Sequence, residues 1–248
     1  MVDHQWINKV EMAAMNAWAA PCQMAYDGWF LRITGGDSKR VNSVNVQRQS
    51  TLLLDEKIKT CEGVYQRFGR PTLFRLPEPF NSPGLCNALA AAGYSSFDPT
   101  YVMGREIDSA APLPDGVTLR EMDCQEWLQF YSFVSGKPLS RLVYHARVLN
   151  VIVPEKVLMG LYIHEEPAAC GMGVVEGELL GYFSIYTHHK VRRQGYATWM
   201  MGALSRWGEE KGAKYGYLQV EAHNTQAIAL YEKLGFERLY TYMYYKRA

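Results

Sequence analysis

The segment from Leu179 to Met201 contains the residues whose types and spacing best suit a chemical role. It reads LLGYFSIYTHHKVRRQGYATWMM, in which an apolar strand pattern passes through a short basic loop into a helix beginning near Gly195. Backbone N–H groups at a helix start lack internal partners, and the helix dipole adds partial positive charge there. Gly195 and Ala197 keep the chain thin at this point, while Arg192 and Arg193 supply charge-assisted hydrogen bonds. The segment therefore predicts an anion site, with a pyrophosphate as the expected anion.

A second element, NTQAIALYEKLGF, follows at residues 224–236. Asn224 predicts a helix cap and Gly235 the end of that helix. An Arg-x-x-Gly-x-Ala string alone is a weak signal, because glycine is common, but the order and separation of the two elements make the pair specific. Together they resemble the GNAT superfamily of N-acetyltransferases over residues 117–248. The matching positions are Arg192, Arg193, Gln194, Gly195, Tyr196, Ala197, Asn224, Ala227, Leu230, Tyr231, Gly235 and Phe236.

The resemblance implies that acetyl-CoA is the co-substrate. It would lie where two neighbouring parallel strands, Leu179–Thr187 and Tyr215–Glu221, splay apart. The pantetheine would run along the first strand near Ile185 and Thr187, and Asn224 would touch the cofactor arm. The pyrophosphate would lie on the amides of Arg192, Arg193, Gln194, Gly195, Tyr196, Ala197 and Thr198.

The resemblance also implies that Tyr231 stands beside the sulfur. Amine attack on a thioester needs a neutral amine and a leaving thiolate that can take a proton. A tyrosine, with a pKa near 10, stays protonated until a thiolate whose thiol has a pKa of about 8.5 forms beside it. Because that transfer is uphill, Tyr231 is expected to act as a hydrogen-bond donor rather than a full acid. The ordinary alternative is a core aromatic with a wet tip.

The general base stays open. Some branches of the family place a Glu midway along the strand before the loop, but residues 181–185 (GYFSI) contain no carboxylate. Glu221, His188 and His223 are the nearest titratable candidates in sequence, and each also has an ordinary surface explanation. A water chain to bulk solvent is equally compatible with the sequence.

Composition excludes several other functions. Lys and Arg total 26 against 25 acidic residues, so the chain lacks the field that nucleic acid or an acidic membrane requires. The five cysteines are scattered and never form a C-x-x-C pair, and His188-His189 lacks further ligands at sensible spacing, so no metal is expected. Buried free thiols, the absence of a signal peptide and the absence of a long apolar run predict a cytoplasmic protein without a membrane span.

Ile107–Val117 is the best linker candidate, because prolines, a glycine and small residues gather there. It divides the 248 residues into segments 1–110 and 117–248. The mixed order of strands and helices predicts an α+β fold, and the resemblance implies two GNAT-like domains, each a mixed, mainly antiparallel sheet flanked by helices. In the second half we expect strands at Val117–Met122, Val157–Ile163, Ala168–Val175, Leu179–Thr187, Tyr215–Glu221 and Phe236–Lys246. Helices there are expected after Asp123, over Ser140–Val151, and after Gly195 and Asn224.

The first half shows a similar order of expected strands and helices. Strands are expected at Trp29–Ile33, Val41–Val46 and Thr72–Leu76, and a helix with Ile58, Cys61, Tyr65 and Phe68 on one face. The segment from Phe74 parallels that from Leu218, with Leu89 opposite Tyr231, and VQRQST at residues 46–51 contains no glycine. We interpret this half as a diverged copy without the phosphate loop or proton donor, although strand–helix–Gly–strand also recurs by chance. Trp29, Arg32 and Arg40 are candidates for reaching the acceptor cleft, against ordinary packing and surface roles.

The sequence therefore predicts an N-acetyltransferase that moves an acetyl group from acetyl-CoA to a primary amine of a small molecule or peptide. Direct transfer in a ternary complex is expected, without metal or nucleic acid. The alternative is a non-catalytic acyl-CoA sensor or adaptor, and a structural module with a vestigial loop is a further rival. The identity of the amine, the acyl length and the oligomeric state stay open.

Overall fold

The computed structural model describes residues 4–108 and 113–247, so residues 109–112 of the expected linker lie outside the described part. The helices and strands before this gap are α1 (His4–Ala17), β1 (Cys22–Tyr26), β2 (Trp29–Ile33), β3 (Val44–Val46), α2 (Leu54–Arg67), β4 (Leu73–Pro77), α3 (Pro83–Ala91) and β5 (Tyr94–Glu106). Those after it are β6 (Val117–Glu121), α4 (Cys124–Ser135), α5 (Val143–Asn150), β7 (Glu155–Ile163), β8 (Glu166–Glu176), β9 (Leu179–Thr187), α6 (Tyr196–Glu210), β10 (Tyr215–Glu221), α7 (Thr225–Lys233) and β11 (Glu237–Arg247).

The described strands join one mixed sheet in the order β1-β2-β3-β4-β11-β5-β10-β9-β8-β7-β6. The pairs β3–β4 and β9–β10 are parallel, and the other described pairs are antiparallel. β9 and β10 pair only over Leu179–Gly181 and Tyr215–Tyr217, although the strands continue to Thr187 and Glu221. The two strands therefore separate toward their carboxyl ends.

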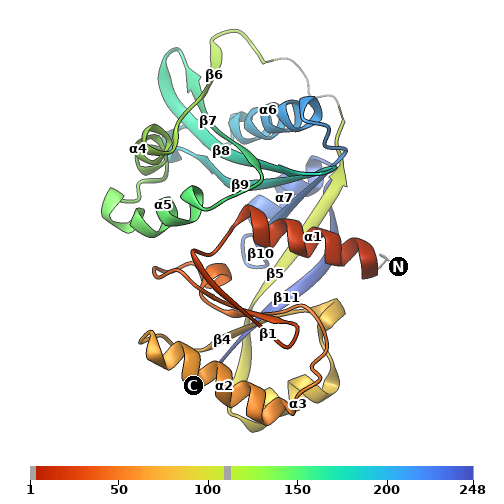
Figure 1. Ribbon diagram of the computed structural model, residues 1–248. Coiled ribbons are helices and arrows are strands. Elements are labelled where there is room, and N and C mark those ends of the chain that lie inside the picture. The colour runs from red at the N-terminus through yellow and green to blue at the C-terminus, as the bar shows by residue number, and fades with distance from the viewer. Residues whose placement is uncertain (1–3, 109–112, 248) are drawn as a thin grey trace.

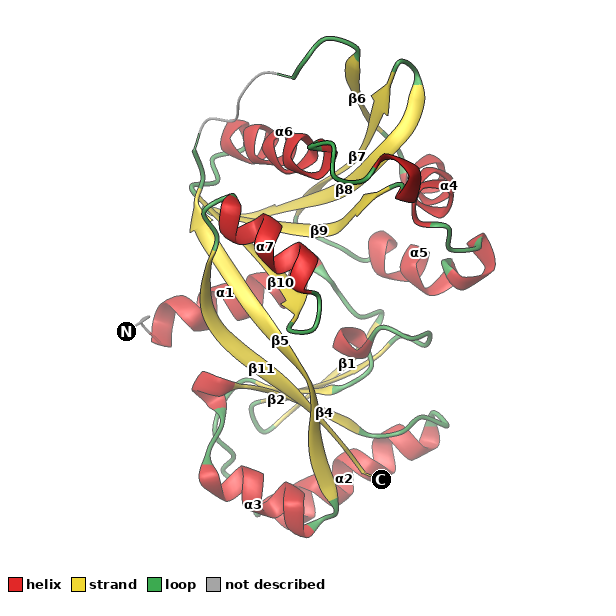
Figure 2. Ribbon diagram, turned by 180° about the vertical axis from the view of Figure 1, so that it is seen from behind, coloured by secondary structure: helices red, strands yellow, loops and turns green. Residues whose placement is uncertain are grey.

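The two halves of the sequence exchange a strand. β5 ends the first half but lies between β10 and β11, whereas β11 ends the chain and pairs with β4. Figures 1 and 2 show β5 and β11 side by side through the centre of the molecule, between α2 and α3 at one end and α4, α5 and α6 at the other. Outward from this central pair the strands follow matching orders, β4-β3-β2-β1 and β10-β9-β8-β7. The matched order supports the hypothesis of two diverged copies. The boundary between residues 110 and 117 stays a prediction: it divides the sequence into two segments, but the strands of both segments join one sheet.

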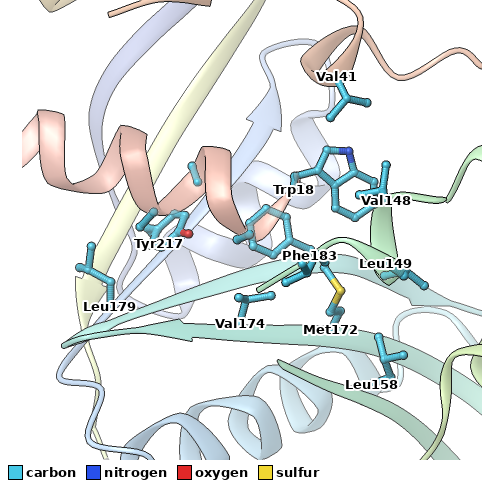
Figure 3. Close-up of a cluster of buried hydrophobic side chains, with 14 of the residues drawn as sticks. Trp18, Val41, Val148, Leu149, Leu158, Met172, Val174, Leu179, Phe183 and Tyr217 are labelled. Carbon is cyan, nitrogen blue, oxygen red and sulfur yellow. The ribbon is translucent and has the colours of Figure 1, made fainter. Parts of the chain in front are cut away.

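Alternating side chains of β9 serve two cores. Phe183 packs in the cluster beneath α1, α4 and α5, while Leu180 and Tyr182 pack with α6 on the opposite face. Trp18 stacks on Phe183 at 5.9 Å between ring centroids, and Figure 3 shows the two rings together above β8. A third cluster holds α2 and α3 against β2, β3 and β4. Both faces of β9 are thus fixed by packing, which positions the residues farther along the strand.

The helix α1 is an element that the sequence analysis did not assign. Ile7, Val10, Ala14 and Ala17 follow helical spacing and are buried. Glu11 on the same face is also buried and receives Arg75 Nη1 at 2.5 Å, Arg75 Nη2 at 2.8 Å and the Tyr240 hydroxyl at 2.6 Å. The charged pair lowers the pKa of Glu11 against the effect of burial, which opposes ionisation. The carboxylate therefore joins α1 to β4 and β11.

Two element predictions were wrong in extent. The strand predicted for Val41–Val46 covers only its last three residues, because Lys39–Val41 form a 3-10 turn and the Asn42 side chain hydrogen-bonds the loop. The helix predicted for Ser140–Val151 divides into a 3-10 turn at Leu139–Arg141 and α5, since the residue between them caps neither with a side chain. The remaining predicted strands and helices match described elements to within a few residues.

Burial corrects two further predictions. Ile58, Cys61 and Tyr65 face the core as expected, but Phe68 follows the end of α2 and is 55% exposed. Of the cysteines, Cys61 and Cys170 are buried, whereas Cys22 is exposed. No described helix has the length and apolar character needed to cross a membrane.

Candidate active site

A cavity of about 400 Å³ opens where β9 and β10 separate. Its position follows from the sheet, because the two parallel strands stop pairing after three residues and their side chains then face a common gap. From the second half it is lined by Tyr131, Tyr182, Phe183, Ser184, Ile185, Tyr186, Leu218, Gln219, Val220, Glu221, Asn224, Tyr231, Tyr242 and Tyr244. The first half contributes Asp37, Ser38, Lys39, Arg40 and Thr100.

A β-bulge interrupts β9 at the cavity wall. The register of β8 moves from Cys170 to Met172 while that of β9 moves from Tyr186 to Phe183, so β9 has one extra residue. Ser184 within the bulge adopts a left-handed φ of 52°. The bulge reverses the alternation, because Phe183 and Ile185, two residues apart, pack on opposite faces of the sheet. Within the bulge, Ser184 and Ile185 have no paired residue in the register with β8, and a bulge of this kind locally interrupts the ladder of backbone hydrogen bonds.

Tyr231 lines the cavity from α7. Asn224 caps that helix, and its side-chain oxygen accepts a hydrogen bond from the Ala227 amide at 3.2 Å. The Tyr231 ring packs edge-on against Phe236 at 6.0 Å, and burial raises the pKa of its hydroxyl to about 12. Among the described residues, none hydrogen-bonds this hydroxyl. Tyr231 is therefore a protonated donor available to a ligand.

The turn before α6 has the exposed, uncapped form that an anion needs. Gly195 adopts a φ of 88° and Arg193 a φ of 62°, and no side chain caps the helix start. The Arg192 guanidinium donates to the Thr187 carbonyl oxygen at 3.3 Å, and the Tyr196 hydroxyl donates to Gln194 at 2.9 Å. Arg192, Arg193, Gln194 and Gly195 are exposed, whereas Tyr196 is buried and Ala197 and Thr198 are half-buried. Thr187 and residues 192–198 do not line the cavity itself but adjoin it at the carboxyl end of β9.

The three candidates for the general base lie in different places. Glu221 lines the cavity, with Lys39 Nζ at 3.6 Å and His223 Nε2 at 3.3 Å from its carboxylate. His223 is an exposed side chain and lies outside the cavity wall. His188 stacks on Phe133, with 5.4 Å between ring centroids, and also lies outside it.

The loop between β2 and β3 forms the wall supplied by the first half. Arg40 lines the cavity, so the candidate role that the sequence gave it is compatible with its position. Trp29 and Arg32 do not reach the cavity: both are buried, and Arg32 donates to the carbonyl oxygens of Met15 and Trp18. A buried guanidinium needs such acceptors, so Arg32 links β2 to the end of α1.

Comparison with known proteins identifies the family. The sequence profile of a family described as "Probable histone acetyltransferase Rv0428c C-terminal" matches residues 5–245. The chain is also 27% identical over 244 residues to the uncharacterized N-acetyltransferase YobR of Bacillus subtilis (strain 168), covering 96% of this chain and 97% of that protein. The chain belongs to this family and is a GNAT N-acetyltransferase.

Solved structures share the fold of this GNAT enzyme. A GCN5-related N-acetyltransferase from Kribbella flavida has a TM-score of 0.75 at 15% identity, over 97% of this chain and 95% of that one. A tandem GNAT protein from the clavulanic acid biosynthesis pathway, solved without AcCoA, has a TM-score of 0.66 at 12% identity, over 95% and 86%. The full-length matches show that the described architecture, including its first half, recurs in other GNAT proteins.

In the first half of this GNAT protein, the Asp27 carboxylate occupies the position that corresponds to the predicted anion site. The loop before α2 corresponds in sheet order to the turn before α6. There the Asp27 carboxylate accepts from the amides of Thr51 at 2.9 Å and Leu52 at 3.1 Å, and Lys57 Nζ lies 3.0 Å away. Hydrogen bonds from Thr51, Ser50 and Leu52 lower the pKa of Asp27. These amides are already used, which agrees with the hypothesis that this half lacks a phosphate site.

Sequence reasoning missed several residues of the cavity wall. Thr100 on β5 and Tyr242 on β11 reach it only through the exchanged strands, and the sequence has no local signal for that exchange. Asp37 and Lys39 line the cavity from the loop between β2 and β3, and neither residue was a site candidate in the sequence. Among residues 4–108 and 113–247, no three His, Cys, Asp or Glu side chains are grouped to hold a metal ion.

Proposed function

We propose that this GNAT enzyme transfers an acetyl group from acetyl-CoA to a primary amine by direct attack in a ternary complex. The observation that carries the proposal is the unpartnered Tyr231 hydroxyl in the cavity between the separating strands β9 and β10. The uncapped turn at Gly195 adjoins that cavity. A donor with a diphosphate at one end and a thioester at the other fits this arrangement.

The donor would lie along the carboxyl end of β9. Its diphosphate would accept hydrogen bonds from the amides of residues 192–198, where the helix dipole of α6 and two arginines favour negative charge. The pantetheine would extend the sheet at the edge that β10 leaves, near Ile185 and Thr187, with Asn224 beside the arm. Gly195 fits this role, because its left-handed φ is available to glycine at little cost.

The acetyl carbonyl would then reach the bulge at Ser184. Amine attack forms the C–N bond and places negative charge on the carbonyl oxygen, and backbone N–H groups where the bulge interrupts the ladder can stabilise that charge. The C–S bond then breaks and the sulfur leaves as a thiolate. Tyr231 would donate a hydrogen bond to this sulfur.

The amine must lose a proton before or during attack. At pH 7 an amine with a pKa near 10.4 is neutral in only about one molecule in 2,500. Asp37 and Glu221 are carboxylates on the cavity wall and can receive that proton or hold the ammonium form. Their presence removes the one argument for a non-catalytic sensor, which was the missing carboxylate on β9.

The test combines binding with turnover. Calorimetry should show stoichiometric binding of acetyl-CoA and of CoA, and thiol release with a panel of amines should identify acceptors. Failure of the full chain to bind either nucleotide would exclude the donor site. Binding without thiol release from any amine would restore the sensor alternative.

A further inference from the structure

A second cavity of about 440 Å³ continues the first. The two share Asp37, Ser38, Arg40, Tyr131 and Ser184, so the cleft extends without a break from the bulge of β9 toward α5. The outer cavity is lined by the loop between β2 and β3 and by residues between α4 and α5. Neither the turn before α6 nor Tyr231 lines it. It is therefore placed for the acceptor rather than for acetyl-CoA.

The outer cavity has an excess of positive charge. Arg40, Lys137 and Arg141 line it together with one carboxylate, Asp37, which gives three positive charges against one negative, or a net +2. Among the described residues none of the three cations has a salt-bridge partner. His145 on the same wall adds no charge near neutral pH, because burial lowers its pKa to about 4. The whole chain has a formal charge of only +1, so this excess is local.

The neighbouring lysine shows what a neutralised cation looks like in this loop. Lys39 pairs with Asp98 and lies 3.6 Å from Glu221, so two carboxylates offset its charge. The guanidinium of Arg40, the next residue, makes instead one hydrogen bond to the described residues, from Nη1 to the Gln219 side-chain oxygen at 3.0 Å. Its remaining N–H donors have no partner among the described residues.

Arg40 is also held in place before any ligand binds. Its guanidinium lies 5.1 Å from the Trp18 ring and 5.7 Å from the Phe183 ring, a packing that favours a cation. Asn42 fixes the loop: its side chain accepts from the amides of Thr34 and Gly35 and donates to two carbonyl oxygens of the loop. A preorganised arginine with free donors loses little entropy when it binds a planar or tetrahedral anion.

The packing of α5 on this loop closes the outer cavity. Gly35 and Gly36 have positive φ values of 88° and 67°, and a Cβ at either would lie within 3 Å of the Tyr144 ring. Tyr144 therefore lies directly on the loop that carries Arg40. Lys137, whose ammonium group donates to the Tyr131 hydroxyl at 3.4 Å, stands on the opposite wall with Arg141.

We propose that the acceptor is a small amine that also carries a carboxylate or phosphate group, and that Arg40 binds this anion while Lys137 and Arg141 attract it at the outer end of the cleft. The proposal rests on the proposed acetyl transfer for the position of the amine, which Asp37 or Glu221 would hold near the acetyl group. A basic peptide fits the same wall poorly, because its own cations would meet an unneutralised positive charge.

The size of the effect follows from one charged hydrogen-bonded contact. Such a contact contributes about 1.5–3 kcal/mol, which corresponds to a preference of roughly 10- to 150-fold in binding or in kcat/KM. Probes should differ in the anion alone, with amines of similar basicity. Suitable pairs are 6-aminohexanoate with hexylamine for the carboxylate, and O-phosphoethanolamine with ethanolamine for the phosphate. The pair that shows the larger ratio identifies the anion.

The experiment uses the full chain saturated with CoA for calorimetry and with acetyl-CoA for thiol release. The wild type should favour the anionic member of at least one pair by tenfold or more. Arg40→Met should bring the ratio between the anionic and the neutral amine close to one, and Arg40→Lys should restore part of the preference. Arg67→Gln, at an exposed site on α2 away from both cavities, is the charge-matched control and should keep the preference.

The two levels of the hypothesis fail differently. Anion-dependent binding that Arg40→Met abolishes supports the anion site even if no amine releases thiol, in which case only the proposed transfer fails. Equal binding and equal kcat/KM within both pairs overturns the anion site even if both members are acetylated. A lysine-rich peptide that is acetylated in preference to every anionic amine likewise overturns it, and a preference that survives in Arg40→Met excludes Arg40 as the anion-binding residue.

Discussion

Replacing Tyr231 with Phe tests how the leaving sulfur is stabilised. The substitution removes one hydroxyl and keeps the ring that packs on Phe236. Because no described residue hydrogen-bonds that hydroxyl, its loss leaves no protein donor or acceptor unsatisfied. The variant should therefore fold normally, and any change in turnover reports on the ligand.

The structure sets the expected magnitude. Burial raises the pKa of Tyr231 to about 12, whereas a free thiol has a pKa of about 8.5. Full proton transfer to the thiolate would be uphill by roughly 5 kcal/mol at 1.36 kcal/mol for each pKa unit. Tyr231 should then act by a hydrogen bond to the developing thiolate, and such a bond to a charged group contributes about 1.5–3 kcal/mol. Tyr231→Phe should lower kcat by roughly 10- to 150-fold, with the acetyl-CoA Kd nearly unchanged.

Thiol release under saturating donor and acceptor gives kcat, and calorimetry gives the Kd for acetyl-CoA. Tyr217→Phe is the matched control, because it removes another buried tyrosine hydroxyl, on β10 but outside both cavities. A kcat for Tyr231→Phe within threefold of wild type, or an equal loss in Tyr217→Phe, would refute the assigned role. A much larger loss, above about 10³-fold, would instead indicate general acid catalysis.

Four further predictions follow from the same contacts. Gly195→Val forces a β-branched residue into a φ of 88°, which costs at least about 1–2 kcal/mol, so calorimetry should show acetyl-CoA binding weakened tenfold or more. Burial lowers the pKa of His145 from 6.5 to about 4. The free energy of unfolding is therefore unaffected by this group above pH 6.5 and falls by up to roughly 3 kcal/mol as the pH drops toward 4. In urea titrations, His145→Phe should lack this pH-dependent loss of stability. Glu11→Gln leaves a buried guanidinium without its counter-charge and should cost about 3–5 kcal/mol in urea denaturation, whereas Glu178→Gln at an exposed pair should change stability little. Residues 117–248 alone lack β5 and should show no cooperative unfolding transition by circular dichroism.

The helix starts of the proposed donor side were predictable from sequence because their signals are local. Asn224 caps α7 through an amide three residues away, and α6 begins directly after Gly195, where a helix was expected. The strands next to these turns, β9 and β10, cover the predicted ranges Leu179–Thr187 and Tyr215–Glu221. Even α1 had a readable pattern, although three of its buried residues are alanines with little apolar weight.

The acceptor side was not predictable because its contacts are distant in sequence. Arg40 hydrogen-bonds Gln219, 179 residues away, and its loop conformation depends on four hydrogen bonds of the Asn42 side chain. A strand prediction that began at Val41 missed this loop, and only Val44, Asn45 and Val46 alternate as strand residues do. The residue pattern of a strand does not show whether it pairs with β4 or with β10. The exchange of β5 and β11 could therefore not be predicted from the sequence.

The exchange explains why the first half matters to the chemistry although it has no phosphate turn of its own. β5 lies against β10, so Thr100 reaches the cavity floor, and β11 crosses to β4 while presenting Tyr242 and Tyr244 to the same cavity. The loop that carries Arg40 is anchored to this shared sheet through β2 and β3. The proposed acceptor cleft is consequently built by both halves at once: of its charged residues, Asp37 and Arg40 come from the first half, and Lys137 and Arg141 from the second. The hydrogen bonds of the Asn42 side chain to Thr34, Gly35 and Ser38 hold that loop in the geometry that places Arg40 on the cleft wall.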